Sequence, residues 1–402
     1  MLWTGNVRGR LADIKGLGHP REVLRGYRFR LSPTPTQEKA LEHTLDLLRW
    51  LYNAALEERR EAYRKQGKSI TKREQEKEIT EIKRDCPEYE EVHTHLLQDV
   101  VKRLDTAFQA FFRRLKEGAA KPGFPRFKGR ERYNSFTYKD AGNGNGAAMV
   151  SGGKRIRLSG IGNVKIKVHR EMKGTLKTVK VKRDSDGHWY ALLTCEVPTR
   201  PLPATHREVG IDVGITTFAA TSDGELIENP RPMQTARIRV ERAQRKVSRR
   251  TKGSKRRSKA RALLAKAHAH VRDVRKDFHH RTARRIVKEY DHIAVEDLNI
   301  KGLAGGMLAK PVHDAGWGQF ITILTEKAED AARVLARVDP RGTSQECSDC
   351  GEVVRKDLSV RVHRCPHCGL VLDRDVNAAR NIHWRAFAPT RPGRGPRGAA
   401  PA

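Results

Sequence analysis

The chain has 402 residues, enough for two or three domains, and it carries 81 Lys and Arg against 48 Asp and Glu. A net charge of +33 makes the folded chain repel itself, so we expect a polyanionic partner, first of all a nucleic acid. Membrane attachment is disfavoured because there is no apolar run of about 18 or more residues and the basic segments lack an apolar face. The first residues also lack the apolar core of a secretory signal, which predicts a cytoplasmic protein with reduced thiols.

The N-terminal third of the chain is predicted to be mainly helical. Residues 1–25 show little periodicity and are interpreted as a floppy leader or a misassigned start. The alternation in YRFRL, from Tyr27 onward, predicts a strand. Apolar residues at three- and four-residue spacing then predict a helix from the N-cap Thr36 to about Lys65. Two more helices are expected, at about Ile70–Arg84 and about His93–Lys116.

A segment of short strands follows the helices. The prolines and glycines of Lys121–Arg130 end the third helix, and four runs of alternating residues between Arg155 and Val197 predict strands. Alternation places the basic residues on one face of a sheet, where they either track phosphates or form an ordinary solvated surface. The residues of this basic face are Lys165, Lys167, Lys177, Lys180 and Lys182.

The C-terminal half begins with a hairpin predicted over Arg207–Glu228. Thr235–Tyr290 contains twenty-one Lys or Arg and four Asp or Glu, which predicts two long basic helices with a break at Lys252-Gly253-Ser254. A short buried strand ending in carboxylates, a helix and a further strand are expected at His292–Ile300, Trp317–Ala332 and Val334–Val338. The Pro-, Gly- and Arg-rich tail 387–402 has little to bury and is predicted to be disordered.

Four of the six cysteines have the spacing of a structural zinc site. They form two Cys-x-x-Cys pairs separated by fourteen residues, and each pair is followed by a glycine that permits a tight turn. Four thiolates close a tetrahedral site and leave no position for substrate or water, whereas a redox dithiol needs only one pair. The predicted ligands are Cys347, Cys350, Cys365 and Cys368. The neighbouring His363 and His367 are expected to face solvent or phosphate.

Three separated carboxylates are candidates for a second metal site. Asp212, Glu296 and Asp375 each lie next to apolar residues, where an isolated charge is costly unless it binds a cation. Magnesium prefers oxygen ligands and bridges phosphates, and two such ions about 3.5–4 Å apart assist phosphodiester hydrolysis. Taken from the residues alone, the alternatives remain open: an Asx turn for Asp212, a cap partner for Glu296 and an N-cap for Asp375.

The chain resembles a known family in several motifs that occur in the family's order. GIDVGITTFA, VEDLNIKGL, DAGWGQF, CSDC, CPHC and DRDVNAARNI resemble TnpB, the RNA-guided nuclease of bacterial transposons and relative of the miniature type V CRISPR effectors. The resemblance extends from YRFRL to Ile382. It implies that Asp212, Glu296 and Asp375 are the catalytic acids and that they hold Mg²⁺, while Asp297, next to Glu296, and Asp373, two places before Asp375, are not catalytic. It also implies that the cysteine segment is a Zn²⁺ module beside the active site.

The resemblance implies an α+β multidomain fold. A β-barrel (wedge) would carry an inserted helical recognition domain, and an RNase H-like (RuvC) α/β nuclease domain would carry an inserted zinc ribbon that binds target nucleic acid. The expected boundaries are 26–36 and 120–203 for the wedge, 37–119 for the helical domain, 204–340 and 371–386 for the nuclease domain, and 341–370 for the zinc ribbon. The leader and the disordered tail complete the chain.

The partners implied by the resemblance are a guide RNA, with one chain for each RNA, and double- and single-stranded target DNA. Backbone charges would hold the heteroduplex while base pairing reads its sequence. The basic face and the helices at Arg242–Lys259 are candidate surfaces for this contact. A short motif adjacent to the target would be read between the helical domain and the barrel, or these residues have plain surface roles: Thr71, Lys72, Gln98, Thr137 and Tyr138. Tyr133, Phe136 and Tyr138 are expected either to stack on bases or to pack in the core, and Trp317 is expected in the core.

Three rival functions are considered. A nuclease-inactive RNA-guided repressor is disfavoured because all three acids are present, and a miniature CRISPR effector would share the fold and the chemistry. DNA strand transfer would use a His-x-His metal site with a tyrosine nucleophile. His93 and His95, like His268 and His270, have this spacing, but both pairs are predicted on helices, where positions two apart point in nearly opposite directions.

Overall fold

The computed structural model describes residues 22–144, 146–150, 152–357 and 359–387. The chain divides into two compact units, Glu22–Pro198 and a second that begins at Thr199, and each is described by itself. The predicted disordered tail, apart from residue 387, and residues 1–21 of the predicted leader lie outside the described residues. Within the described part, none of the helices has the length and apolar character needed to cross a bilayer.

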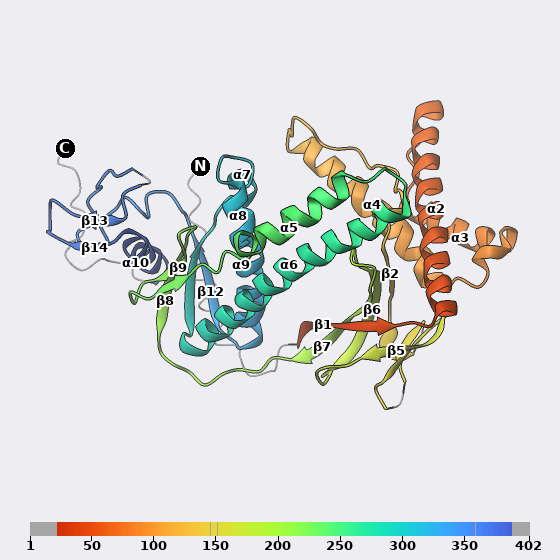
Figure 1. Cartoon of the computed structure of the whole chain (residues 1–402), viewed down its shortest axis with the longest axis horizontal. Coiled ribbons are helices and arrows are strands. Elements are labelled where there is room, and N and C mark those ends of the chain that lie inside the picture. Colours follow the sequence, from red (N-terminus) through yellow and green to blue (C-terminus); the bar gives the residue numbers. More distant parts are fainter. Residues whose placement is uncertain (1–21, 145, 151, 358, 388–402) are drawn as a thin grey trace. The chain divides into compact units, whose positions relative to one another are not determined.

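The first unit contains a seven-stranded antiparallel sheet in the order β2-β6-β7-β1-β5-β4-β3. Figure 1 labels β1, β2, β5, β6 and β7 of this sheet. The sheet is nearly closed, because Gly146, directly before β3, lies against the ring of Tyr138 in β2. A Cβ atom at Gly146 would come within 2.8 Å of that ring, and its φ of +78° also favours glycine. The strands are β1 (Glu22–Ser32), β2 (Ser135–Tyr138), β3 (Ala147–Met149), β4 (Arg155–Leu158), β5 (Gly162–Lys167), β6 (Thr175–Arg183) and β7 (Trp189–Pro198).

Three helices are inserted between β1 and β2: α2 (Pro35–Gln66), α3 (Lys72–Asp85) and α4 (Thr94–Lys116). The N-cap prediction for the first helix was wrong, since the cap is Thr34 and not Thr36. Thr34 accepts a hydrogen bond from the backbone N–H of Gln37, and the Gln37 side chain accepts one from the Thr34 N–H. Pro35 at the first helical position has no N–H to satisfy, which moves the helix start one residue ahead of Thr36.

The aromatic residues of the β2 region belong to the core. Tyr133, Phe136 and Tyr138 are 5%, 0% and 0% exposed, which decides between the two predicted roles. The Tyr138 hydroxyl donates to the carbonyl of Ser159 at 2.9 Å. Its side chain therefore offers no surface to a nucleic acid, and its predicted role in motif reading is wrong because tertiary burial competes with stacking for the same ring.

The second unit is built on a five-stranded mixed sheet in the order β10-β9-β8-β11-β12. The predicted hairpin is confirmed as the antiparallel strands β8, β9 and β10, whereas β8, β11 and β12 are parallel neighbours. The predicted strand at Val334–Val338 is also confirmed as β12. The strands are β8 (Glu208–Val213), β9 (Thr217–Thr221), β10 (Leu226–Glu228), β11 (His292–Glu296) and β12 (Val334–Val338).

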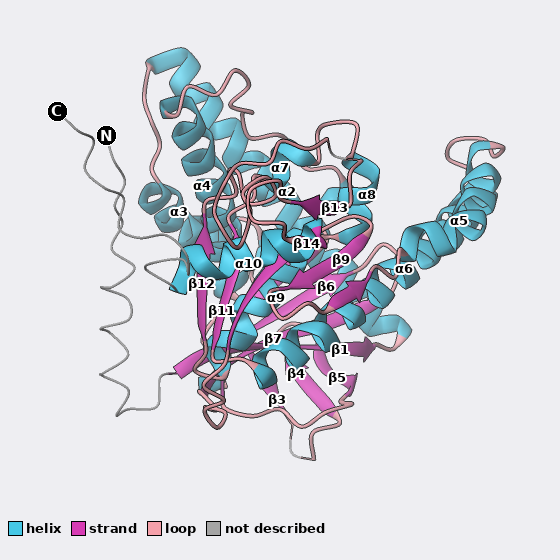
Figure 2. Ribbon diagram, turned by 90° about the vertical axis from the view of Figure 1, so that its left-hand side faces the viewer, coloured by secondary structure: helices cyan, strands magenta, loops and turns pink. Residues whose placement is uncertain are grey.

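Helices cover both faces of this mixed sheet. Two long helices, α5 (Pro232–Ser248) and α6 (Lys255–Glu289), lie side by side, and the predicted break between them is confirmed by Ser254, which caps α6. One sheet face packs with α6 and α9 (Trp317–Asp330) around Phe218, Phe278 and Phe320. The other face carries α10 (Arg374–Phe387), which lies against β8 and β11. Figure 2 shows α10 near β11 and β12. The smaller elements are α7 (Ile300–Leu303), α8 (Ala309–Ala315), β13 (Val362–Arg364) and β14 (Val371–Asp373).

The backbones of α10 and β8 approach each other closely at Gly210. A Cβ atom at this position would lie 2.1 Å from the Ala379 carbonyl oxygen and 2.5 Å from the His383 backbone nitrogen. Because both atoms belong to backbone, no side-chain rotation could relieve the clash. Glycine at position 210 is therefore what allows α10 to rest directly on the sheet.

We predict that Gly210→Ala destabilises the protein by about 1–3 kcal/mol or more, because the added methyl group must push α10 away from β8. Thermal unfolding of the full chain measures this effect. Gly26→Ala is the matched control, since a Cβ atom there meets nothing within 4 Å. Equal melting temperatures for the two variants would contradict the close approach.

Candidate functional site

The structure brings the three acids selected from the sequence to one end of the five-stranded sheet. Asp212 and Glu296 occupy neighbouring positions near the carboxyl ends of the parallel strands β8 and β11. Asp375 lies in the first turn of α10, four residues before Ala379, which rests over Gly210. Residues two apart on a strand share a face, as do residues four apart on a helix. Asp212 and Asp375 therefore face the same small space, beside Glu296.

The acids disfavour one another's charge. Burial raises the pKa of Asp212 well above its usual range, and the charges of Glu296 and Asp375 raise it further, although Arg374 acts in the opposite direction. Burial also raises the pKa of Glu296, against a hydrogen bond from the Thr343 hydroxyl that lowers it. Both Glu296 and Asp375 are 8% exposed. A bound cation would remove this electrostatic cost, and clustered acids with raised pKa values are common at functional sites.

The neighbouring acids Asp297 and Asp373 have other partners. Asp297 is exposed and pairs with Arg337 at 3.0 Å. Asp373 caps α10, because its carboxylate accepts hydrogen bonds from the backbone N–H groups of Asp375 at 2.8 Å and Val376 at 3.2 Å. The N-cap role considered for Asp375 is thus filled by Asp373, which leaves the Asp375 carboxylate available to the site.

Other side chains around the acids were not selected from the sequence. The Thr343 hydroxyl donates to Glu296 Oε1 at 2.5 Å. Asp375 lies beside two guanidinium groups, that of Arg374 at 3.3 Å and that of the exposed Arg361 at 3.7 Å. Thr343 and Arg361 are distant in sequence from the acids they contact, so no local pattern pointed to them.

Two buried asparagines of α10 hold the segment that leads into the first cysteine pair. Asn377 donates to the Glu346 carbonyl at 2.8 Å and accepts from the Ser348 N–H at 2.9 Å. Asn381 donates to the carbonyls of Thr343 and Glu346 at 2.8 and 2.7 Å. Both asparagines are fully buried. Their four-residue spacing in DRDVNAARNI is the sequence signal that could have identified them as a pair on one helix face.

The ligand atoms of the three acids suit hard cations. Among the described residues, the only group of three or more potential ligand atoms that all lie within 4.8 Å of one another is the cysteine cluster, so the three carboxylates are spread more widely. Ligands spread more widely than those of one closed ion site are compatible with two ions about 3.5–4 Å apart. Carboxylate oxygens are also the ligands that Mg²⁺ prefers.

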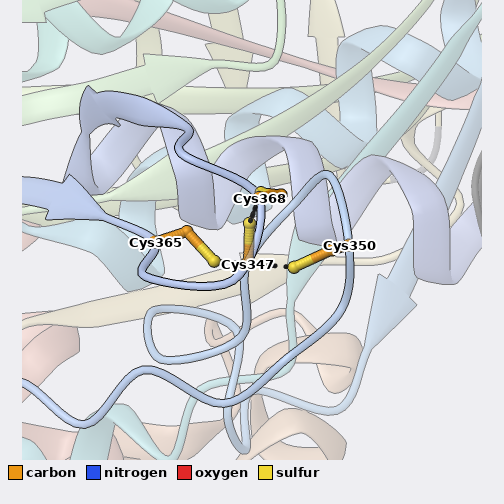
Figure 3. A group of neighbouring side chains, drawn as sticks. All are labelled: Cys347, Cys350, Cys365 and Cys368. Carbon is orange, nitrogen blue, oxygen red and sulfur yellow. Dashed lines mark hydrogen bonds between the residues drawn. The ribbon is translucent and has the colours of Figure 1, made fainter.

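The four cysteines form a compact cluster with the geometry of a zinc site (Figure 3). Cys347 and Cys368 Sγ atoms are 3.6 Å apart, and Cys350 and Cys365 Sγ atoms are 3.5 Å apart. Tetrahedral Zn–S bonds of about 2.3 Å place sulfur atoms about 3.8 Å apart. The four thiols therefore fit a zinc ion whose coordination positions are all filled.

The two cysteine pairs form matching turns. The N–H groups of Gly351 and Gly369 each donate at 3.0 Å to the carbonyl of the first cysteine in their pair. Both glycines have positive φ, 82° and 78°. His367 is exposed as predicted, but His363 is fully buried, with its ring beside Lys356. The prediction for His363 was wrong because β13 turns this side chain inward, and burial lowers its pKa.

The predicted nucleic-acid contacts lie at several places in the first unit. Thr71 caps α3, and Lys72, the next residue, pairs with Glu76 at 3.3 Å. Gln98 lies in α4, which contacts β2 through the Arg103 guanidinium, a donor to Thr137 at 3.2 Å. In the sheet, alternation leaves Lys165 and Lys167 exposed, with Lys180 and Lys182 half-buried. Lys177 pairs with Glu196 at 2.5 Å.

The His93 and His95 rings lie closer together than predicted. Their centroids are 4.8 Å apart, because His93 is the N-cap of α4 and not a helical residue. Tyr138 lies 6.0 Å from His93, but its hydroxyl is buried and already donates to a carbonyl. The His95 ring is hydrogen-bonded to the Lys139 carbonyl at 3.1 Å. The tyrosine whose ring contacts His93 is therefore not exposed to solvent, although the two histidine rings are not directed apart as predicted.

Three family descriptions match segments of this chain. Residues 192–306 match a family described as "Probable transposase", residues 317–382 match the "Cas12f1-like, TNB domain", and residues 23–68 match a "Helix-turn-helix domain". A Streptomyces pristinaespiralis protein named "Putative RNA-guided DNA endonuclease" is 35% identical over 377 residues, which cover 90% of this chain and 89% of the relative. The chain belongs to the TnpB family. A TnpB-like protein of Acanthamoeba polyphaga mimivirus is 27% identical over 51% of this chain and 42% of its own length.

Two further comparisons concern the fold and its parts. A similarly named Escherichia coli (strain K12) protein is 27% identical and covers 89% of this TnpB chain and 91% of its own. A solved Cas12f1-sgRNA-target DNA complex has a chain that matches 90% of this one with a TM-score of 0.54 and 13% identity, which shows a shared fold. The segment matched as helix-turn-helix consists here of strand β1 and the single helix α2.

For the thiol cluster we predict one zinc per chain by elemental analysis. Cys347→Ser combined with Cys350→Ser should lose the metal and lower the melting temperature by roughly 5 °C or more, because the turns around the ion lose their ligands. Cys86→Ser is the control, since Cys86 lies outside the cluster. Retention of zinc in the double variant would refute the ligand assignment.

For the acid cluster we predict that Asp212→Asn stabilises the magnesium-free protein at neutral pH. The folded-state pKa of Asp212 is raised, so its ionisation opposes folding as pH rises above the ordinary range of aspartate. Removing the charge should add on the order of 1 kcal/mol, or about 2–4 °C, and the gain should vanish as pH falls into that ordinary range. Melting curves across pH test this, with Asp297→Asn as a control that brings no gain. A lower melting temperature for Asp212→Asn at neutral pH would contradict it.

Proposed function

We propose that this chain is an RNA-guided DNA endonuclease that cleaves DNA by metal-dependent hydrolysis of phosphodiester bonds. The observation that carries the proposal is the placement of Asp212, Glu296 and Asp375 at one end of the five-stranded sheet, with raised pKa values for the first two. The relatives named as RNA-guided DNA endonucleases align over about nine tenths of the chain and support the same activity.

In this proposal the chain's own side chains prepare the site for a phosphodiester. Asp212, Glu296 and Asp375 would hold two magnesium ions, which when bound supply charge stabilisation for the attacking and leaving oxygens. Thr343 fixes the orientation of Glu296 through its hydrogen bond. Asp373 caps α10 and so fixes the first turn that bears Asp375. The exposed Arg361 guanidinium lies beside Asp375 and donates to the Thr216 hydroxyl at 2.8 Å, and in this proposal it would contact a phosphate oxygen.

The finer parts of the proposal concern the guide and the domains. The guide RNA would derive from a transposon end, and cleavage would occur beside a short adjacent motif. The sheet of the first unit would serve as the wedge, α2 to α4 as the recognition helices, and the second unit as the RuvC-like nuclease with the zinc ribbon inserted before α10. The basic residues of β5 and β6 and of α5 and α6 would hold nucleic-acid backbone without reading sequence.

We predict that Asp212→Ala, Glu296→Ala and Asp375→Ala each lower magnesium-dependent cleavage of a guide-matched plasmid by a factor of about 10³ or more. Binding of guide RNA should survive, because none of the three side chains is a cation that contacts phosphate. The measurement is plasmid cleavage by the protein co-purified with RNA from its native locus, whose sequence also identifies the guide.

Asp297→Ala is the matched control for this experiment. It removes a carboxylate next to Glu296 that is exposed and pairs with Arg337, so cleavage should continue. Undiminished cleavage by all three acid variants would refute the active-site assignment. Target binding without cleavage by the wild-type protein would instead favour the RNA-guided repressor.

A further inference from the structure

The loop between α4 and β2 forms a hollow surface that the proposed cleavage reaction does not use. Two cavities of about 230 and 370 Å³ lie between this loop and the helices α2 and α4. They adjoin, because Tyr52, Ala107, Lys128 and Arg132 line both. We call the two cavities together the loop hollow. The larger cavity falls in the size range of small-ligand sites.

The loop is held in place by specific contacts with both helices. The Asn53 side chain on α2 accepts from the Lys128 N–H at 2.8 Å and donates to the Lys128 carbonyl at 3.1 Å. Arg114 on α4 donates to the carbonyls of Pro122 and of Gly123, the latter at 3.0 Å. Asn53 thus satisfies both the N–H and the carbonyl of Lys128, as a neighbouring strand does in a sheet, and this holds Lys128 in place. The hollow is therefore a built feature of the unit.

Two aromatic rings of the loop remain partly uncovered at the hollow. Phe124 meets the rings of Phe108 and Phe111 edge-on at 5.5 and 5.2 Å, yet 45% of it is exposed. Phe127 is 43% exposed, and the guanidinium of Arg60 lies 5.2 Å from its ring centroid. Rings that are fixed in place but left open to solvent are poorly explained by core packing. They are suited to stacking on a planar ligand.

The charge of the hollow has one sign. Its lining includes five cationic side chains and no carboxylate: Arg103, Arg114, Arg126, Lys128 and Arg132. Arg103 pairs with Asp99 at 2.7 Å. Across residues 22–387, apart from the few positions left undescribed, Arg126, Lys128 and Arg132 have no ion-pair partner within 4.0 Å. These three cations, of which Lys128 also lies 5.5 Å from the centroid of the Tyr52 ring, stand beside two partly exposed rings. They match the two parts of a nucleotide, its phosphate and its base.

We propose that the loop hollow binds an unpaired nucleotide of a nucleic-acid strand. The base stacks on Phe127, beside Phe124, and the adjoining phosphate lies by Lys128 and Arg132. This site is separate from the predicted contact residues of β5, β6 and α3, and it deepens the proposed function because it rests on nucleic-acid binding by this chain. Both RNA and DNA present this chemistry, so the test includes one arm for each.

The test measures the affinity of the full-length protein for fluorescently labelled single-stranded RNA and single-stranded DNA of mixed sequence. Phe127→Ala should weaken binding about tenfold, the stacking contribution of one base, while Phe127→Tyr retains a ring and should restore it. Lys128→Gln with Arg132→Gln should flatten the dependence of log affinity on log salt by roughly 0.7 for each phosphate that the variant no longer neutralises. Ultraviolet crosslinking followed by mass spectrometry should place an attached nucleotide on the loop peptide.

The controls are exposed residues of the same unit that do not line the hollow. Phe112→Ala removes a ring that is 57% exposed on α4, and Lys68→Gln removes an exposed cation after α2. Neither should change affinity or salt dependence. Melting temperatures show whether each variant is folded. Because Phe127→Tyr keeps an aromatic ring in the loop, its comparison with Phe127→Ala separates the effect of stacking from a change in loop packing.

The possible outcomes separate the two proposals. Weaker binding in the RNA arm alone assigns the site to RNA, weaker binding in the DNA arm alone assigns it to DNA, and weaker binding in both assigns it to either strand. Wild-type affinity in the hollow variants, with no crosslink to the loop, overturns the loop-hollow site and leaves the proposed nuclease intact. A wild-type protein that binds neither oligonucleotide overturns both proposals.

Discussion

The contact of α10 with β8 at Gly210 is the constraint on which the candidate active site depends. A strand bearing one acid and a helix bearing another reach a common space only if their backbones approach more closely than side chains normally allow. Gly210 permits this approach, and the Ala379 carbonyl occupies the space a side chain would have filled. The parallel pairing of β8 with β11 by itself places Glu296 beside Asp212. Three carboxylates from distant parts of the chain are thereby placed together at an electrostatic cost that the surrounding fold must outweigh.

The elements that could be predicted from sequence are those whose pattern is local. Alternation identified the strands around Val164 and Val179, and the three- to four-residue spacing of leucines identified α2 and α4. The break at Lys252-Gly253-Ser254 was also found correctly, since Ser254 is a good cap. Errors arose at element boundaries. The start of α2 was placed at Thr36 because the preceding proline was treated as a turn residue, and His93 was assigned to a helix that it only caps.

The candidate site was predicted in part, and the division has a physical basis. The cysteine spacing reflects a local turn geometry, so the sequence alone predicts the four thiols that form the cluster in the structure. The acids were selected by family resemblance, because an aspartate after a strand has many uses. What surrounds them depends on tertiary contacts: Thr343 and Arg361 reach the acids across the fold, and His363 and Tyr138 are buried by neighbours that no short pattern contains. Sequence can suggest ligands, but only packing decides which polar groups support them.

Asn377 and Asn381 link the cysteine cluster and the acid cluster to the same helix, α10. Both side chains form hydrogen bonds with the backbone that leads into the cysteine segment, and the first turn of the helix that carries them contains Asp375. A shift of that helix by one residue would rotate its side chains by about 100°. The rotation would break the hydrogen bonds of both asparagines and would also move the Asp375 carboxylate out of the site. The sulfur-rich module and the third acid therefore cannot drift independently. A change in the cysteine cluster should therefore alter the position of Asp375 through a rotation of α10, and a change at Asp375 should alter the cysteine cluster in the same way.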